Sequence, residues 1–423
     1  MSFHRNEQVG TVQDMHSSRS SVARRSTSRR AALAGLGMLG LFLAGCAKDA
    51  PQDTFQPAGE NARTIDNLQR PVFWIAGVIG VIVFILMGYI MVRYRDRGQS
   101  LPEQTHGKMS LELGLTMIPT LIMVGIAVPT MATIFDLAKT SDTECVVNVT
   151  GQQWWWEFDY PVQEGCVSGG IKQPIVTSGQ MPIPTGTKVL LKIESRDVIH
   201  SFWVPKLNGK KDSVPGRTHT LRMEVDEPGI FSGQCAEFCG LSHARMRMEV
   251  VGLNQADFDT WATNQLEPYE APTDPLALTG EATYAAQCSR CHQVDGLKKD
   301  DGSLIVSQPE LYVVSGAAPN LTNLMTRNTF AGATWDLLTP ACRDKVWNAS
   351  PEEFGALYLK GVTRECLNEA ELRDWIRDAP NKKPMYTDPT KLEPSDGKVR
   401  GMPALGLNDD QITELIAYLL ERK

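Results

Sequence analysis

Residues 235–246 read CAEFCGLSHARM, and an upstream segment, residues 197–205, reads DVIHSFWVP. These two stretches decide most about the fold and the site, because together they contain two thiols, two imidazoles and a thioether. Such a soft set of ligands favours copper over magnesium or calcium. The candidate ligands of this set are His200, Cys235, Cys239, His243 and Met246.

Zinc, a disulfide and a single copper are the alternatives for these stretches. Zinc uses cysteine and histidine at similar spacings, but it rarely uses methionine. A disulfide between the two cysteines would explain neither the second histidine nor the methionine. A single blue-copper site needs only one cysteine, so two cysteines indicate a pair of coppers bridged by thiolates.

The sequence around the motif indicates β-structure. Residues 146–160, 188–195 and 219–226 alternate apolar and polar side chains and are rich in β-branched residues. Proline and glycine turns, such as residues 181–186, separate these runs. We therefore predict an all-β barrel or sandwich over residues 139–268.

The N-terminus carries a predicted export signal over residues 1–45. Basic residues that end at Arg30 precede a short apolar run, AALAGLGMLGLFLAG, which is too short to span a bilayer comfortably. The following Cys46 makes this region similar to a bacterial lipoprotein signal, which implies a lipid on the cysteine. An ordinary signal with a chance cysteine is the alternative. Residues 46–70 are polar and predict an exported linker.

Two apolar segments predict a transmembrane hairpin over residues 71–138. The first, residues 71–92, contains no charge and is followed at once by three arginines. At about 1.5 Å per residue it spans a bilayer core of about 30 Å, and the arginines place that end in the cytoplasm. The second, residues 111–137, contains Pro119 and Pro129 and has Glu112 near its start. Everything after residue 138 should therefore lie outside the cytoplasm.

Charge and cysteine usage fit an exported protein. The formal net charge is −7, which is the opposite of what nucleic-acid binding requires. An acidic surface suits a basic partner or simple solubility. Of the nine cysteines, the eight besides Cys46 sort into four pairs, which suits an oxidising compartment. Two of these pairs lie outside the motifs, Cys145 with Cys166 and Cys342 with Cys366. A disulfide is predicted for the second of them.

A second cofactor motif follows a proline-rich linker at residues 269–278. The sequence Cys288-Ser-Arg-Cys291-His292 is the attachment pattern of c-type haem. Both thiols would bond to the haem vinyl groups, and His292 would be an axial ligand of the iron. A redox-active CxxC disulfide, the alternative, would not need the adjacent histidine.

The other axial ligand should be a distant methionine, which raises the reduction potential of a haem. Met402 lies in the segment GMPA just before a predicted C-terminal helix and is the best candidate. Met385 is its rival, and Met325 comes third. Residues 279–423 are longer than a minimal cytochrome c domain, and segments 296–316 and 331–370 look like insertions.

Residues 60–268 closely resemble subunit II of the haem-copper cytochrome c oxidases. The resemblance rests on the hairpin, GQQWWW (151–156), DVIHSFWVP, VPGR (214–217) and CAEFCGLSHARM. It implies a cupredoxin-like barrel that holds the mixed-valence copper pair CuA. By resemblance, Cys235 and Cys239 bridge the coppers, His200 and His243 are terminal ligands, Met246 is a weak ligand, and Glu237 binds through its main-chain carbonyl.

Further residues match positions that have roles in that family. Trp154 would be the point where electrons enter from cytochrome c, although a clustered tryptophan is more often packing. Glu112 would lie at the mouth of a proton channel, although a glutamate at a membrane boundary could simply reach for water. The carboxylate of Glu237 would bind magnesium at the interface with subunit I, and Asp197 would lie near that interface.

The order of hairpin, copper domain, linker and haem domain resembles the caa3-type oxidases, in which a cytochrome c domain is fused to subunit II. Asn320-Leu-Thr and Thr329-Phe-Ala-Gly add to this resemblance. The implied fold is multidomain, with a two-helix transmembrane hairpin, an all-β copper domain (139–268) and an all-α cytochrome c domain (279–423). The implied location is the bacterial plasma membrane.

The implied function is electron input to a terminal oxidase. Electrons would come from a cytochrome c or a cytochrome bc-type complex and pass through haem c and CuA to subunit I, which reduces oxygen to water and pumps protons. Subunit III is a further implied partner. A nitric oxide reductase subunit and a membrane-tethered electron carrier without a catalytic partner are the alternatives. The hairpin argues against the carrier, because a lipid alone would tether one.

Overall fold

The computed structural model describes residues 50–98, 106–297, 318–387 and 400–422. Contacts group the chain into two units, Met1–Ala50 and Pro51–Lys423, and every helix and strand described belongs to the second unit. The predicted signal peptide and Cys46 lie outside the described residues.

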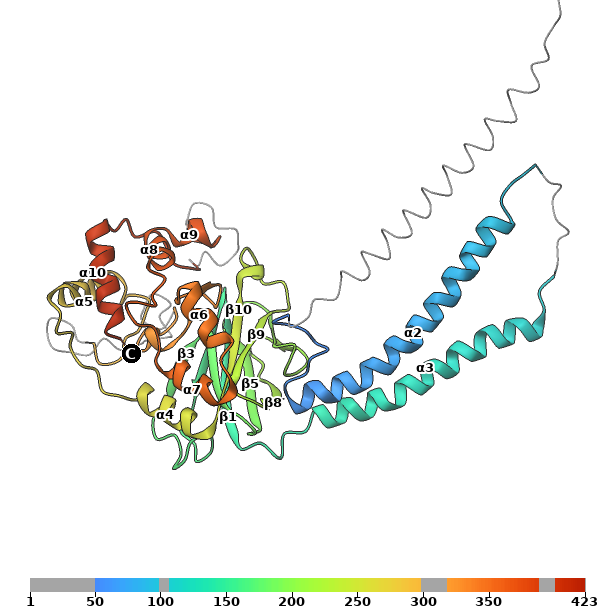
Figure 1. Ribbon diagram of the computed structural model, residues 1–423, viewed down its shortest axis with the longest axis horizontal. Helices are drawn as coiled ribbons and strands as arrows, with labels where there is room; N and C mark the ends of the chain where they lie inside the picture. Colours follow the sequence, from blue (N-terminus) through green and yellow to red (C-terminus); the bar gives the residue numbers. More distant parts are fainter. Residues whose placement is uncertain (1–49, 99–105, 298–317, 388–399, 423) are drawn as a thin grey trace, which may run out of the picture. The chain divides into compact units, whose positions relative to one another are not determined.

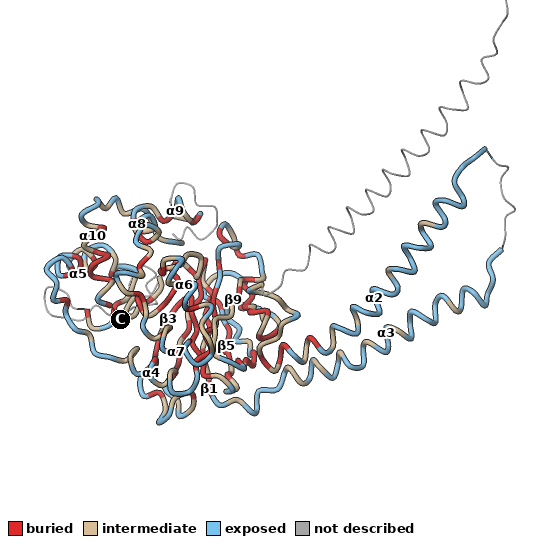
Figure 2. Tube along the Cα trace, viewed as in Figure 1, coloured by how far each residue is buried: buried red, intermediate tan, exposed pale blue. Residues whose placement is uncertain are grey.

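Two long helices form the predicted hairpin. They are α2 (Glu60–Arg93) and α3 (Met109–Leu137), and they lie side by side (Figure 1). Their apolar side chains face outward, with Trp74 78% and Phe84 75% exposed. Figure 2 shows this exposure along most of both helices. Exposure of such apolar surfaces to water is unfavourable, so these helices fit the apolar interior of a bilayer.

The helix α2 begins at Glu60, inside the segment that the sequence predicted as a linker up to residue 70. The first turns of α2 are polar but docked on the β-structure, where Asn61 and the buried Arg222 exchange hydrogen bonds of 2.8 and 2.9 Å. Arg63 also forms an ion pair with Asp226. The sequence shows no apolar periodicity here, because polar contacts rather than an apolar stripe hold this part of the helix.

The all-β prediction is confirmed as a sandwich of two five-stranded sheets. The first has the order β3-β2-β1-β5-β8 and the second the order β4-β10-β9-β6-β7. The strands are β1 (Cys145–Gln152), β2 (Trp155–Tyr160), β3 (Ile175–Ser178), β4 (Gln180–Pro184), β5 (Val189–Ser195), β6 (His200–Trp203), β7 (Lys211–Ser213), β8 (His219–Met223), β9 (Gly229–Cys235) and β10 (Arg247–Leu253).

Large aromatic side chains fill the sandwich. Trp156, Phe158 and Phe202 are fully buried and meet edge to face, with ring centroids 5.4 and 6.4 Å apart. A disulfide joins Cys145 to Cys166, and the helix α4 (Gln255–Gln265) follows the last strand. This rigid scaffold carries the loop between β9 and β10, which is the CAEFCGLSHARM motif.

The C-terminal part is mostly helical, as predicted. Its helices are α5 (Pro275–Gln287), α6 (Pro340–Trp347), α7 (Pro351–Leu359), α8 (Glu369–Arg377), α9 (Ala379–Lys382) and α10 (Asp409–Leu420). The helix α5 starts inside the predicted linker of residues 269–278, because Asp274 caps its N-terminus. A short ribbon of β11 (Thr329–Phe330) and β12 (Trp335–Asp336) is an exception to the all-α prediction.

The helices α5 and α10 pack against each other at close range. A side chain at Gly280 would meet the carbonyl of Glu414 at 2.0 Å, so this crossing requires glycine. The rings of Tyr284 and Tyr418 meet beside it at 5.3 Å. The side chain of Asn408 caps the N-terminus of α10. The predicted disulfide between Cys342 and Cys366 is present in the insertion.

Candidate metal centre and adjoining cavity

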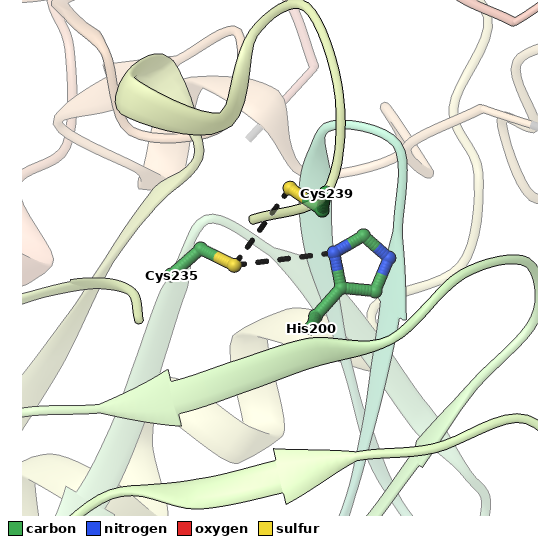
Figure 3. A group of neighbouring side chains, drawn as sticks. All are labelled: His200, Cys235 and Cys239. Carbon is green, nitrogen blue, oxygen red and sulfur yellow. Dashed lines mark hydrogen bonds between the residues drawn. The ribbon is translucent and has the colours of Figure 1, made fainter. Parts of the chain in front are cut away.

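The loop between β9 and β10 gathers the predicted copper ligands. It is closed at its base, where the Cys235 amide donates to the Met246 carbonyl at 2.9 Å. The strand β6 supplies His200 from the side, because β6 pairs with β9 so that Phe202 lies opposite Cys235. Figure 3 shows the side chains of His200, Cys235 and Cys239 pointing toward one another.

Short distances connect all six candidate donor atoms. The two Sγ atoms lie 3.8 Å apart. On one side, His200 Nδ1 lies 4.0 Å and the Glu237 carbonyl lies 3.2 Å from Cys235 Sγ. On the other side, His243 Nδ1 lies 3.7 Å and Met246 Sδ lies 3.8 Å from Cys239 Sγ. Two central sulfurs flanked by nitrogen, oxygen and thioether donors can hold a pair of soft metal ions.

Asp197 orients the His200 ring. Its carboxylate accepts a hydrogen bond of 2.8 Å from His200 Nε2, which leaves Nδ1 facing the sulfurs. Burial opposes a charged imidazole, but the contacts with Asp197 and Cys235 raise the pKa of His200. The neighbouring thiol of Cys239 and the His200 ring lower the pKa of Cys235 well below its ordinary value. One sulfur is thus readily available as a thiolate, the form that binds metal.

Trp154 is buried directly beneath this loop. Its indole Nε1 donates to the Cys239 carbonyl at 3.0 Å, and only 2% of the residue is exposed. On its other side it meets the ring of Tyr386, with centroids 5.3 Å apart. Trp154 therefore contacts both the motif loop and the C-terminal part of the chain. The neighbouring Trp156 is fully buried in the core of the sandwich.

A cavity of about 660 Å³ lies next to Trp154. Its walls come from both parts of the chain, with Trp154, Trp155 and Asp197 on one side and the CxxCH segment on the other. The residues of the predicted haem site that line it are Cys288, Cys291, His292, Met385 and Met402. Its size lies in the range of ligand sites.

The cavity suits a haem with histidine and methionine ligands. His292 Nδ1 lies 2.8 Å from the Pro319 carbonyl, so Nδ1 carries the proton and Nε2 is left for iron. Burial also lowers the pKa of His292 and so favours its neutral form. Both Met402 and Met385 line the cavity, whereas the fully buried Met325 is absent from its lining.

Arg327 is a buried cation in the cavity wall that sequence reasoning missed. It is 4% exposed, and its Nε has no hydrogen-bond partner in the described part of the chain. The buried hydroxyl of Thr329, also in the lining, has none there either. The terminal NH groups of Arg327 donate to Ser178 Oγ at 2.5 Å and to the Asn320 carbonyl, so Nε is its one donor without a partner there. A buried cation with a free Nε donor, beside a free hydroxyl, fits the carboxylates of a haem.

The side chains of Glu112 and Glu237 lie apart from these contacts. Glu112 occupies the first turn of α3 and is exposed. The Glu237 side chain is exposed while its carbonyl faces Cys235.

Two family models match the chain. "Cytochrome C oxidase subunit II, periplasmic domain" covers residues 145–253, and "Cytochrome C oxidase subunit II, transmembrane domain" covers residues 50–133. Cytochrome c oxidase subunit 2 of Alkalihalophilus pseudofirmus is 36% identical over 296 residues, which cover 67% of this chain and 83% of that protein. The chain belongs to the cytochrome c oxidase subunit II family.

Other members of the family are similar over different lengths. Cytochrome c oxidase subunit 2 of Bacillus sp. PS3 is 31% identical over 406 residues, which cover 92% of this chain and 96% of that protein. The periplasmic domain of cytochrome oxidase subunit II from Bradyrhizobium japonicum is 23% identical and covers 30% of this chain and 96% of that structure, with a TM-score of 0.27.

Membership settles several coarse properties of this subunit II. It is a membrane protein with two spans, and it works with subunit I in a haem-copper oxidase complex. The periplasmic domain of this family implies a CuA copper centre, with which the cluster of His200, Cys235 and Cys239 is compatible.

A buried carboxyl at the junction of the two parts predicts a pH dependence of stability. Glu249 on β10 is buried, and the Gln180 side chain donates a hydrogen bond of 2.7 Å to its carboxyl group. The charges of Asp336 and Arg343, in the segment 331–370, also interact with this carboxyl group. Burial raises its pKa to about 7. Because its pKa is raised, the folded protein holds this proton more tightly than the unfolded chain does. The resulting contribution to stability is fully present below the ordinary pKa of 4.5, and it is lost as the pH rises through about 7.

Glu249→Gln should therefore stabilise this subunit by about 3 kcal/mol at high pH and flatten its pH dependence. Thermal unfolding of the purified complex between about pH 5 and pH 8 would measure both effects. The exposed Glu353→Gln is the control. An equal slope in wild type and Glu249→Gln would show that the carboxyl is not the cause.

Proposed function

We propose that this subunit is the electron input of a caa3-type terminal oxidase. Electrons would arrive from a cytochrome c or a cytochrome bc-type complex at a covalent haem c, pass to CuA, and then pass to subunit I for reduction of oxygen coupled to proton pumping. The observation that supports this most is Trp154, whose indole donates to Cys239 while the residue also lines the cavity of the CxxCH segment.

The copper pair would be bridged by Cys235 and Cys239. His200 and His243 would be terminal ligands, and Met246 and the Glu237 carbonyl would be the weaker ones. When bound, the pair supplies fast one-electron transfer. The chain contributes rigidity, because β6, β9 and β10 hold the donor atoms and Asp197 fixes the His200 ring. A site that is already arranged reorganises little when its charge changes.

The haem would be attached to Cys288 and Cys291. His292 would be one axial ligand and Met402 the other. A bound haem supplies a second one-electron centre. The chain holds His292 in the correct tautomer through the Pro319 carbonyl and offers Arg327 to the haem carboxylates.

The outer face of the motif loop fits subunit I. Phe238 in the motif loop is 77% exposed, and Leu241 in the same loop is also exposed. The other motif stretch adds the exposed Val198 and Ile199. Exposed apolar side chains of this kind are typical of an interface. The exposed carboxylate of Glu237 among them would share a magnesium ion with subunit I.

The membrane part supplies the remaining proposals. Glu112 at the start of α3 would lie at the mouth of a proton channel. The copper and haem parts would lie outside the cytoplasm, with a lipid on Cys46, which lies outside the described residues. Subunit III would complete the complex.

Purification of the intact complex tests this function. The expected result is a near-infrared mixed-valence copper band, a covalent haem c band, and oxygen uptake with cytochrome c as donor. Absence of the haem band would refute the fusion reading, and absence of the copper band would refute CuA. Turnover of nitric oxide without oxygen uptake would favour the nitric oxide reductase, and no turnover of either would favour a tethered carrier.

A further inference from the structure

Lys383 is a buried lysine that reaches from the C-terminal part into the sandwich. It is 3% exposed, and its Nζ donates to the carbonyls of Trp154 and Ala331, each at 2.8 Å. No described carboxylate pairs with it. A buried amino group without an acid is costly, and burial lowers the pKa of Lys383 to about 7. As an ammonium or as an amine, Nζ can donate to both carbonyls, so the contact persists in either form.

The turn that contains Ala331 has a backbone conformation that brings it close to both Lys383 and Trp154. Residues Ala331, Gly332 and Ala333 all have left-handed φ values, of 54°, 73° and 52°. Such values are unfavourable for alanine, so surrounding contacts must hold the turn in place. A side chain on Gly332 would lie 2.6 Å from the Trp154 carbonyl, which shows how closely the turn approaches that residue.

The same turn also holds the end of the motif loop. The Gly332 carbonyl accepts from the Arg247 amide at 3.0 Å, and Thr334 Oγ1 donates to the Arg245 carbonyl at 2.6 Å. Both partners lie next to Met246, one of the candidate ligands. The turn therefore contacts Trp154 on one side and the motif loop on the other.

Further contacts surround this junction. Ser242 Oγ donates to the Pro384 carbonyl at 2.5 Å, and Arg245 donates to the Lys382 carbonyl. Arg400 forms an ion pair of 3.6 Å with Asp197, the residue that orients His200. Residues of the C-terminal part thus contact the motif loop and Asp197 at several points around Trp154.

We propose that Lys383 is a positioning residue that fastens the haem-bearing part to the Trp154 edge of the copper part. This rests on the proposed function. Lys383 and the turn of residues 331–334 hold the haem cavity and the motif loop at one fixed separation, across which electrons would pass.

The test is Lys383→Met in the intact complex, with Lys382→Met as the matched control. Lys382 is the neighbouring lysine, but its Nζ bonds Glu371 within the C-terminal part. A photoexcited ruthenium complex would deliver one electron to the haem, and optical absorption would follow its transfer to copper. We expect Lys383→Met to slow this step by about tenfold, because the rate of a positioned reaction falls steeply with misplacement. Lys382→Met should match wild type.

Two further readouts separate positioning from general damage. The haem and copper bands and both reduction potentials should be unchanged in Lys383→Met. The slowed step should become dependent on solvent viscosity, because the two parts would then have to meet before transfer. An unchanged, viscosity-independent rate with both bands present would overturn the inference.

The remaining outcomes are also decisive. If the wild-type complex lacked the haem or copper band, the proposed function would fail and not the positioning role alone. If Lys383→Met failed to assemble, Thr334→Val would decide, since it removes only the hydroxyl that bonds the carbonyls of Arg245 and, within the turn, Ala331. A several-fold, viscosity-dependent slowing would support the inference, and wild-type behaviour would refute it.

Discussion

Cys239→Ser should abolish the near-infrared copper band and stop electron delivery to subunit I. The Cys239 sulfur lies within 4 Å of three other candidate donor atoms, on Cys235, His243 and Met246. A serine hydroxyl is harder and far less acidic than a thiol, so it would not bridge two coppers as a thiolate does. The fold should persist, because the substitution is nearly the same size and the sandwich does not depend on it.

Metal analysis, near-infrared absorption and oxygen uptake of the purified complex would measure this effect. Met248→Leu is the matched control, because Met248 is a fully buried sulfur residue on β10 close to the motif but outside the cluster of donors. Its band and activity should equal those of wild type. A Cys239→Ser complex that kept the wild-type band and copper content would contradict the thiolate-bridged pair.

Met402→Ala should lower the reduction potential of the haem by on the order of 0.1 V, against a range of about 0.8 V that axial ligands set. A thioether ligand favours reduced iron, so its loss favours the oxidised form. Potentiometric titration of the haem absorption would measure the shift. Electron transfer to copper should change with it, because the driving force changes.

Met385→Ala is the comparison that makes this prediction specific. Met385 lines the same cavity and packs on Gly401, where an added side chain would meet its sulfur at 2.5 Å. Its loss should loosen the loop that carries Met402 and lower the potential less. A larger fall with Met385→Ala than with Met402→Ala would show that Met385 is the ligand.

The candidate copper site could be predicted almost completely from the sequence. Five of its six residues lie within one loop of the sandwich, so their spacing already limits how far apart they can be. The CxxCH segment is equally local, and its two cysteines and histidine share one short stretch at the end of α5. Spacing identifies such sites because the chain itself keeps the donor atoms close.

Boundaries were predicted less well where packing overrides local pattern. The polar start of α2 was taken as linker, because its helix is held by Arg222 and Asp226, which lie far along the chain. The ribbon of β11 and β12 was missed for a similar reason. Its left-handed turn is held by contacts with Arg247 and Lys383 and not by its own sequence.

The sequence by itself determined the classes of part and their order: an apolar hairpin, a β-domain with soft metal ligands and a helical part with a haem motif. Hydrophobic length, alternation and ligand spacing are local properties, so they can be read without a fold. Only the tertiary structure decided that Asp197 orients His200, that Arg327 faces the cavity and that Lys383 meets the Trp154 carbonyl across 229 residues of sequence. Contacts between distant segments depend on how whole elements pack, and no spacing in the chain records them.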